Sequence, residues 1–140
     1  MEISLARPLP TGKGYVSQWF GEHPDWYKKY GLYAHNGIDY AVASGTQVLA
    51  AHGGTIYIGN DPSGYGLWVR IVGSSFQTIY GHNSKFLFAA GDKVELGQPI
   101  ALSGNTGNST GPHVHFSIKV NGMRNPGYAN WIDPVPFRDV

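Results

Sequence analysis

The segment that decides the fold is GNTGNSTGPHVHFSIKV, residues 104–120. After its glycine-rich start it alternates polar and apolar side chains with a period of two, the pattern of a half-buried β-strand. His113 and His115 then share one face of the strand, about 6–7 Å apart. The apolar members of the alternation, which we expect to face the core, are Val114, Phe116, Ile118 and Val120. The pattern therefore predicts a strand that is anchored by its apolar side and presents two imidazoles on the other.

Turn residues divide the rest of the chain into short β-type segments. The 140 residues include 20 glycines and 9 prolines in small clusters, and no segment has a sustained helical period with caps. We expect strands over residues 14–21, 38–42, 46–51, 54–60, 66–73, 76–82 and 113–122, and two short strands around Gly97 within residues 91–104. Residues 22–37 read as a long polar-aromatic loop. The predicted fold class is all-β, a mainly antiparallel sandwich-like core with little helix and long loops that form a groove.

Length and charge limit the class of partner. A chain of this length predicts one domain over residues 1–140. Its net charge is +1 and its ten basic residues are scattered, so the clustered basic surface that nucleic-acid binding requires is missing from the sequence. No apolar run is long enough for membrane insertion. The absence of cysteine excludes disulfides and thiolate metal sites. We expect a monomer.

A second polar motif supplies candidate metal ligands. In HNGID, residues 35–39, the Asn36–Gly37 pair disfavours a helix, so a tight turn would bring His35 and Asp39 toward a common centre. Together with His115 they form the His/carboxylate set that zinc uses in catalytic sites, with a fourth position left for water. Taken alone, each motif has a simpler interpretation, because Asp39 could cap backbone N–H groups of a turn and the two strand histidines could lie on a partly solvated strand face.

Hydrolysis at such a site also needs a general base and a stabiliser of the oxyanion. The HExxH motif is absent, and none of the three glutamates lies in such a frame. The remaining candidates are His113 and His82, the latter in the segment TIYGH with Tyr80 expected on the same strand face. An imidazole, with a pKa near ~6.5, can fill either role.

Three motifs of the chain together resemble those of a known family. HNGID, YGH and GNTGNSTGPHVHF, in this order and at these separations, resemble the lysostaphin-type (LytM-like) zinc endopeptidases that cleave peptidoglycan peptides. The resemblance is strongest over residues 31–135. It implies that His35, Asp39 and His115 bind one Zn²⁺, and that His82 and His113 are the catalytic pair around the attacking water. Which of the two histidines is the base stays open.

The resemblance implies a zinc-dependent endopeptidase that hydrolyses peptidoglycan peptide bonds, in the stem peptide or the cross-bridge, with metal-activated water as the nucleophile. The alternative is a non-catalytic module that binds peptidoglycan or activates another hydrolase. The expected place of action is the bacterial cell wall, on its extracellular or periplasmic face. Without a recognisable export signal, a phage lysin, a virion component or an excised domain of an exported protein are all compatible with the sequence. Candidate substrate contacts are Tyr30, Tyr33, Tyr80, Asn105 and Thr106.

Two further expectations concern tryptophans. Trp19 and Trp68 are expected in the core through their strands. Trp26 and Trp131 could line the substrate cleft, although Trp131 could equally pack the end of the chain onto the sheet.

Overall fold

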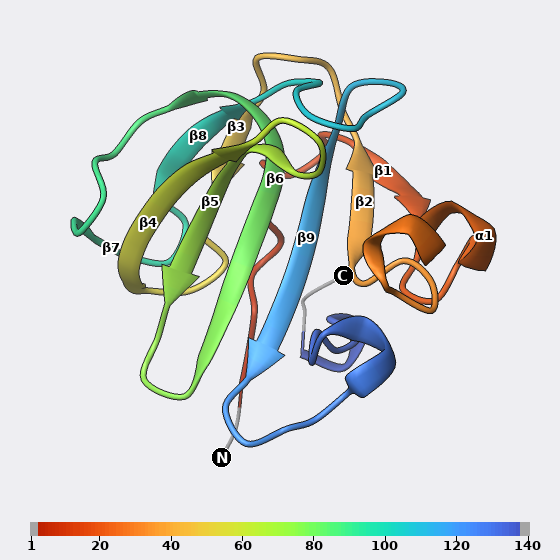
Figure 1. The fold of residues 1–140 in the computed structure, drawn as a ribbon. Helices are drawn as coiled ribbons and strands as arrows, with labels where there is room; N and C mark the ends of the chain where they lie inside the picture. Colours follow the sequence, from red (N-terminus) through yellow and green to blue (C-terminus); the bar gives the residue numbers. More distant parts are fainter. Residues whose placement is uncertain (1–2, 138–140) are drawn as a thin grey trace.

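The computed structural model describes residues 3–137 and consists mainly of antiparallel β-structure (Figure 1). The strands are β1 (Tyr15–Gln18), β2 (Ile38–Ala41), β3 (Gln47–Leu49), β4 (Gly54–Asp61), β5 (Gly66–Val72), β6 (Phe76–Phe86), β7 (Lys93–Val94), β8 (Pro99–Ser103) and β9 (His113–Val120). Helical structure is limited to α1 (Pro24–Tyr27) and the 3₁₀ turns η1 (Lys28–Tyr30), η2 (Pro126–Tyr128) and η3 (Val135–Phe137). The predicted fold class, all-β with little helix, is confirmed.

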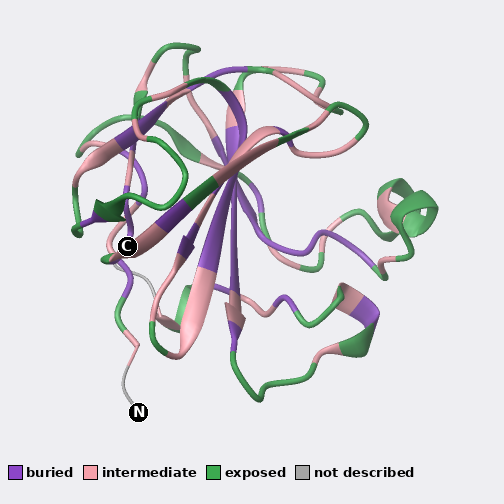
Figure 2. Ribbon diagram, turned by 60° about the vertical axis from the view of Figure 1, so that its left-hand side comes forward, coloured by how far each residue is buried: buried purple, intermediate pink, exposed green. Residues whose placement is uncertain are grey.

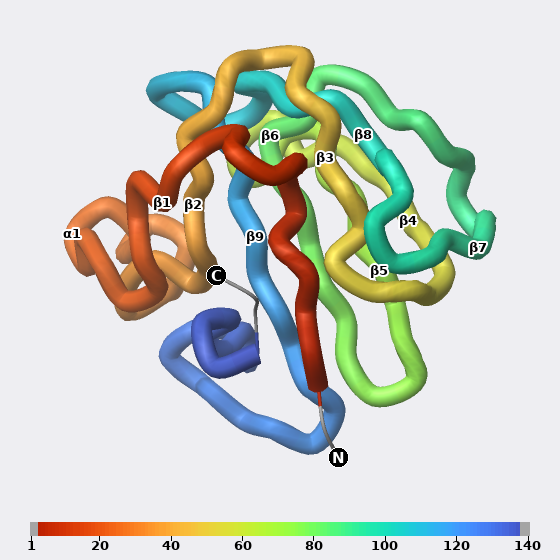
Figure 3. The backbone as a smooth tube through the Cα atoms, turned by 180° about the vertical axis from the view of Figure 1, so that it is seen from behind, coloured from red at the N-terminus to blue at the C-terminus, as the bar shows by residue number. Residues whose placement is uncertain are grey.

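All strand pairs are antiparallel, and the main sheet has the order β1-β2-β9-β6-β5-β4-β7. The pair β3–β8 branches from it, because β8 also pairs with the far half of β6. The N-terminal segment runs behind β9 and β6 in Figure 1 and comes to the front in Figure 3. This segment and the β3–β8 pair therefore cover one face of the sheet, and the opposite face carries α1 at one side.

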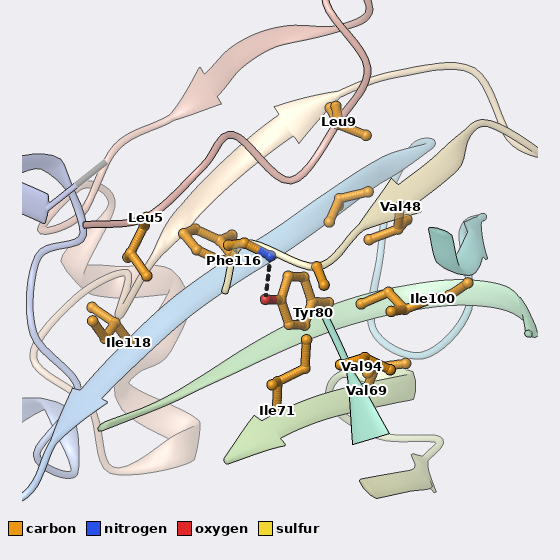
Figure 4. Packing of buried hydrophobic residues seen from close by; sticks show 14 of the residues in the cluster. Leu5, Leu9, Val48, Val69, Ile71, Tyr80, Val94, Ile100, Phe116 and Ile118 are labelled. Atoms are coloured by element: carbon orange, nitrogen blue, oxygen red, sulfur yellow. Dashed lines mark hydrogen bonds between the residues drawn. The ribbon is translucent and has the colours of Figure 1, made fainter. Parts of the chain in front are cut away.

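The alternation predicted for residues 113–120 builds the core. The four apolar residues of β9 are buried, and all belong to one cluster with side chains of β2, β3, β4, β5, β6 and β8. Leu5 and Leu9 of the N-terminal segment close this cluster (Figure 4). Burial runs through the central strands, whereas α1 is exposed (Figure 2). The histidines of β9 consequently project from the face opposite the core.

Strand β6 departs from the prediction at His82. It was expected to end there but continues to Phe86, and it changes partner from β9 to β8 at this point. Between the pairs Val69↔Tyr80 and Leu67↔Asn83, β5 advances two residues while β6 advances three, which makes a β-bulge. The φ of His82 is 65°, in the left-handed region. The extra residue breaks the alternation, so Tyr80 and His82 lie on different faces.

Tyr80 therefore points into the core and not into the substrate groove. Its side chain is fully buried, and its hydroxyl accepts a hydrogen bond from the Ala51 N–H at 3.0 Å (Figure 4). The expectation that Tyr80 contacts substrate is wrong, and the bulge is the reason.

The expectation for Trp19 is also wrong. It follows the end of β1 and its side chain is 44% exposed. Trp68, within β5, is partly buried. Across residues 3–137 no helix combines the length and the apolar character that a membrane span requires.

Candidate active site

Three neighbouring strands bring the predicted ligands together. Asp39 of β2 lies directly opposite His115 of β9, and Gly81 of β6 lies opposite His115 on its other side. His35 reaches the same point from the turn before β2. That turn packs tightly on β9, since a Cβ added to Gly37 would lie 2.3 Å from Ser117 Oγ and 2.5 Å from the Phe116 carbonyl oxygen. Only glycine fits at this approach.

The three predicted ligand atoms form a nearly equilateral triangle. His35 Nε2, His115 Nδ1 and Asp39 Oδ1 are each 3.1 Å from the other two. Donor atoms that share a tetrahedral zinc ion at about 2.0–2.1 Å stand about 3.3–3.4 Å apart, so the triangle has nearly the required size. All three side chains are buried. His35, Asp39 and His115 are also the group of the described residues that could hold a metal ion.

Hydrogen bonds on the outer side of each imidazole fix its tautomer. His35 Nδ1 lies 3.1 Å from the Trp19 carbonyl oxygen, which can only accept, so Nδ1 carries the proton. His115 Nε2 lies 2.6 Å from Ser117 Oγ, whose own proton is donated to the Asn36 carbonyl oxygen at 2.9 Å. His115 Nε2 is therefore also a donor. The inner nitrogens are left with lone pairs that converge on the Asp39 carboxylate, and such an arrangement requires a cation.

The electrostatics of the centre set the charges of Asp39 and His115. Burial raises the pKa of Asp39, but the contacts with His115 and His35 outweigh burial and hold the pKa of this carboxyl well below its usual range. Burial lowers the pKa of His115, and the Asp39 carboxylate only partly opposes that effect. At neutral pH the centre consequently holds an ionised carboxylate beside a neutral His115, the protonation states in which both groups bind metals.

The other two predicted histidines stand beside this triangle. The rings of His82 and His113 are 4.4 Å apart, and the His82 ring is 6.4 Å from that of His115. Each donates its Nδ1 proton to a carbonyl oxygen at 2.7 Å, His82 to Thr106 and His113 to Gly111. Both Nε2 atoms are thereby left as acceptors. His113 Nε2 lies 3.5 Å from Asp39 Oδ2.

The imidazoles of His82 and His113 differ in burial. Burial lowers the pKa of His82 to about 4, helped by the neighbouring charges of His113 and His115 and opposed by the Thr106 carbonyl and Asp39. His82 is therefore neutral at pH 7. His113 is only partly buried, and it is the more accessible of the two from the cleft.

A cleft of about 880 Å³ opens onto these histidines. Its walls come from residues 17–36, the β4–β5 turn at 61–65, the loop at 108–113 and residues 129–131. Tyr30 lies in the wall and links two of its other segments. Its hydroxyl donates to the Ser63 carbonyl oxygen at 3.0 Å and accepts from the Asn108 amide. Trp26 and Trp131 also line the cleft.

The other predicted substrate contacts lie outside the cleft wall. Tyr33 is 71% exposed and packs edge-on against Tyr128. Asn105 accepts a hydrogen bond from Ser109 within its own loop. Thr106 acts behind the site, because its carbonyl holds His82 and its hydroxyl donates to the Asn83 carbonyl oxygen at 2.7 Å.

Two residues at the site were not predicted from the sequence. Ser117 orients His115, and Tyr65 places its ring 5.0 Å from that of His115 while its hydroxyl accepts from the Asn36 amide at 3.1 Å. The period of β9 places Ser117 on the histidine face, so a signal for it was present. Tyr65 sits in a turn whose path a single sequence does not reveal.

The family model described as peptidase family M23 matches residues 33–126. The peptidoglycan DD-endopeptidase ShyA of Vibrio cholerae is 43% identical over 89 residues, which cover 63% of this chain and 21% of that protein. The catalytic domain of lysostaphin from Staphylococcus simulans superposes with a TM-score of 0.75 at 32% identity, covering 89% of this chain and 91% of that one. A zinc-containing peptidase from Vibrio cholerae gives a TM-score of 0.77 at 29% identity, over 94% and 39% of the two chains.

The chain spans only about a fifth of the length of the curated relatives it matches. The family match, by contrast, covers most of this chain and contains all five histidine and aspartate residues of the site. The chain belongs to peptidase family M23.

Proposed function

We propose that the chain is a zinc-dependent endopeptidase domain that hydrolyses peptide bonds in bacterial peptidoglycan. The observation that carries the proposal is the triangle of His35 Nε2, His115 Nδ1 and Asp39 Oδ1, in which three buried acceptor atoms converge and the tautomers are set from outside. Zinc fits this donor set by ligand type, size and charge. A zinc ion bound there would act as a Lewis acid toward the scissile carbonyl and would make water a better nucleophile.

His113 is the stronger candidate for the general base. Its Nδ1 proton is committed to the Gly111 carbonyl, so Nε2 is free to accept a proton from a water molecule in the cleft. The resulting imidazolium would face Asp39 Oδ2, 3.5 Å from Nε2, which stabilises the added charge. The same nitrogen can then return the proton to the leaving amine.

His82 suits a different task. A group with a pKa of about 4 is a weak base at neutral pH, so it would take little part in proton abstraction. Its Nε2 is an acceptor beside the His113 ring, and we infer that it orients the water or a substrate N–H by hydrogen bonding. The left-handed backbone of His82 holds this ring in place.

The substrate assignment rests on the relatives and on the cleft. The name of ShyA supports peptidoglycan peptides as the substrate class and the cell wall as the place of action. The cleft is open and partly aromatic, as an extended peptide requires. A purely structural metal site would use four protein ligands and would need neither His82 nor His113 beside it.

Mass spectrometry of the fragments released from purified cell-wall sacculi tests the proposal. We expect new peptide ends that disappear with a zinc chelator and return with added zinc, and these ends also identify the bond. His115→Ala should lose both zinc and hydrolysis, whereas His113→Ala should keep zinc and lose hydrolysis. Zinc-loaded protein that releases nothing from sacculi of several wall chemistries would contradict the proposal and favour a binding module.

A further inference from the structure

The face of the sheet that carries the histidines also carries two cations with no acidic partner. Arg70 of β5 and Lys119 of β9 both lie on this face. Lys119 follows His115 and Ser117 at the period of the strand. Arg70 pairs with Ile79 of β6, and Ile79 pairs with Ser117 of β9, so these three residues lie in one row across the sheet. Among residues 3–137 neither side chain forms a salt bridge or a hydrogen bond. In Figure 1 no helix or loop covers this face over β4 and β5.

Aromatic rings hold both cations in position. The Arg70 guanidinium lies 5.6 Å from the centre of the Tyr57 ring and 5.7 Å from that of Trp68. Lys119 Nζ lies 4.5 Å from the centre of the Trp131 ring. These are cation–π distances, at which a ring restrains a cation without neutralising it. Trp131 also lines the cleft, so Lys119 stands at the edge of the cleft.

Desolvation indicates that this site favours an anion. Arg70 Nε is buried without a hydrogen-bond partner, although guanidinium N–H groups normally find an acceptor. The pKa of Lys119 is lowered, first by burial and then by the positive charge of Arg70. Two neighbouring cations that are partly desolvated and mutually repulsive are stabilised by a bound anion.

We propose that Arg70 and Lys119 form a carboxylate-binding subsite for the peptidoglycan peptide at the edge of the cleft. The inference rests on the proposed function and adds a specificity contact to it. Stem peptides carry free carboxylates on their acidic residues and at their C-terminus. Lys119 lies four residues beyond His115, about 13 Å along the strand, and an extended peptide spans that distance in about four residues. Charge and reach therefore both match a carboxylate about four residues from the bond that is cut.

Steady-state kinetics on two matched substrates test the subsite. One substrate is a soluble cross-linked stem-peptide dimer with free carboxylates, and the other is the same dimer with its carboxylates amidated. For the free dimer we expect Arg70→Gln combined with Lys119→Gln to raise KM about tenfold, the effect of two partly exposed ion pairs, and to leave kcat unchanged. For the amidated dimer this double variant and the wild type should have the same KM.

Matched variants separate charge from packing. Arg70→Lys combined with Lys119→Arg keeps both charges and should retain the low KM. Lys85→Gln removes one positive charge from an exposed position on the far half of β6 and should behave as the wild type. The tenfold effect should shrink as salt screens the contact.

An unchanged KM in the double glutamine variant would overturn the subsite, and so would an equal rise in KM for the free and amidated dimers. If the wild type cleaved neither dimer, the proposed function would fail, and calorimetric binding of the two dimers would then decide the subsite alone. Binding of the free dimer that was no tighter to the wild type than to the double variant would refute it.

Discussion

Replacement of Ser117 by alanine tests whether the outer hydrogen bonds build the metal centre. Ser117 is fully buried, accepts from His115 Nε2 at 2.6 Å and donates to the Asn36 carbonyl oxygen at 2.9 Å. Alanine leaves both partners unsatisfied, and each such buried group costs about 1–3 kcal/mol. It also frees His115 to rotate or to change tautomer. Partners of this kind tune metal affinity by about 10–100-fold, so we expect the dissociation constant for zinc to rise by that factor.

The assay is competition for zinc with a fluorescent indicator at neutral pH. Ser103→Ala is the matched control, because Ser103 is equally buried and its hydroxyl also makes two hydrogen bonds, to the Ala43 carbonyl and from the Thr46 N–H. We expect the control to lose stability and to keep its zinc affinity. Unchanged zinc affinity in Ser117→Ala would show that Ser117 does not orient His115, and the tautomer argument would then be wrong.

Three further outcomes are expected. Removal of zinc by a chelator should lower the melting temperature, because ligand at a thousandfold excess over its dissociation constant stabilises the fold by about 4 kcal/mol; equal melting temperatures would contradict a metal-stabilised site. Gly37→Ala should destabilise the protein in urea by about 2–3 kcal/mol, since its methyl would collide with Ser117, whereas Gly111→Ala meets open space and should cost much less. Burial lowers the pKa of His52, and the hydrogen bond to the Gly53 carbonyl only partly offsets that effect, so the folded state takes up this proton later than the unfolded chain as pH falls. This contribution of His52 to the free energy of unfolding is complete above pH ~6.5. Below that pH the unfolded chain takes up the proton first, and the free energy of unfolding falls by at most about 1.4 kcal/mol per pH unit. Urea unfolding between pH 7 and pH 5 should therefore show a shallower loss of stability in His52→Gln than in the wild type, and parallel curves would contradict it.

Local patterns predicted most of the strands and the three residues that the structure brings together in one triangle, for a physical reason. The alternation in β9 reflects one polar face, which lies at the site, and one apolar face, which packs in the core, and both faces are realised in the structure. The short motif HNGID could be placed because its Asn–Gly pair disfavours a helix and favours a turn, and the structure has that turn packed against β9 at Gly37. Such features depend on neighbours in the sequence or on one adjacent strand, so one chain is enough to recognise them.

Contacts between segments that are distant in the chain could not be predicted from the sequence. Tyr65 joins the site through a turn whose path depends on other loops, as the hydrogen bonds of Tyr30 to Ser63 and Asn108 illustrate for the wall beside it. Trp19 has the side chain of a typical core residue but follows the end of a short edge strand, and it is 44% exposed. Side-chain chemistry alone does not determine such positions.

The bulge in β6 is the most instructive failure, because the same irregularity that misplaced Tyr80 constructs the catalytic pair. An uninterrupted strand would put Tyr80 and His82 on one face, so that either the core would lose its tyrosine or the cleft would lose its histidine. One extra residue lets Tyr80 fill the core while His82 turns toward His113. Its cost is a left-handed backbone at a residue other than glycine, which is offset by the hydrogen bonds of His82 to Thr106 and Tyr65. A rule of strict alternation therefore fails at the position where the fold changes strand partners and places a functional side chain.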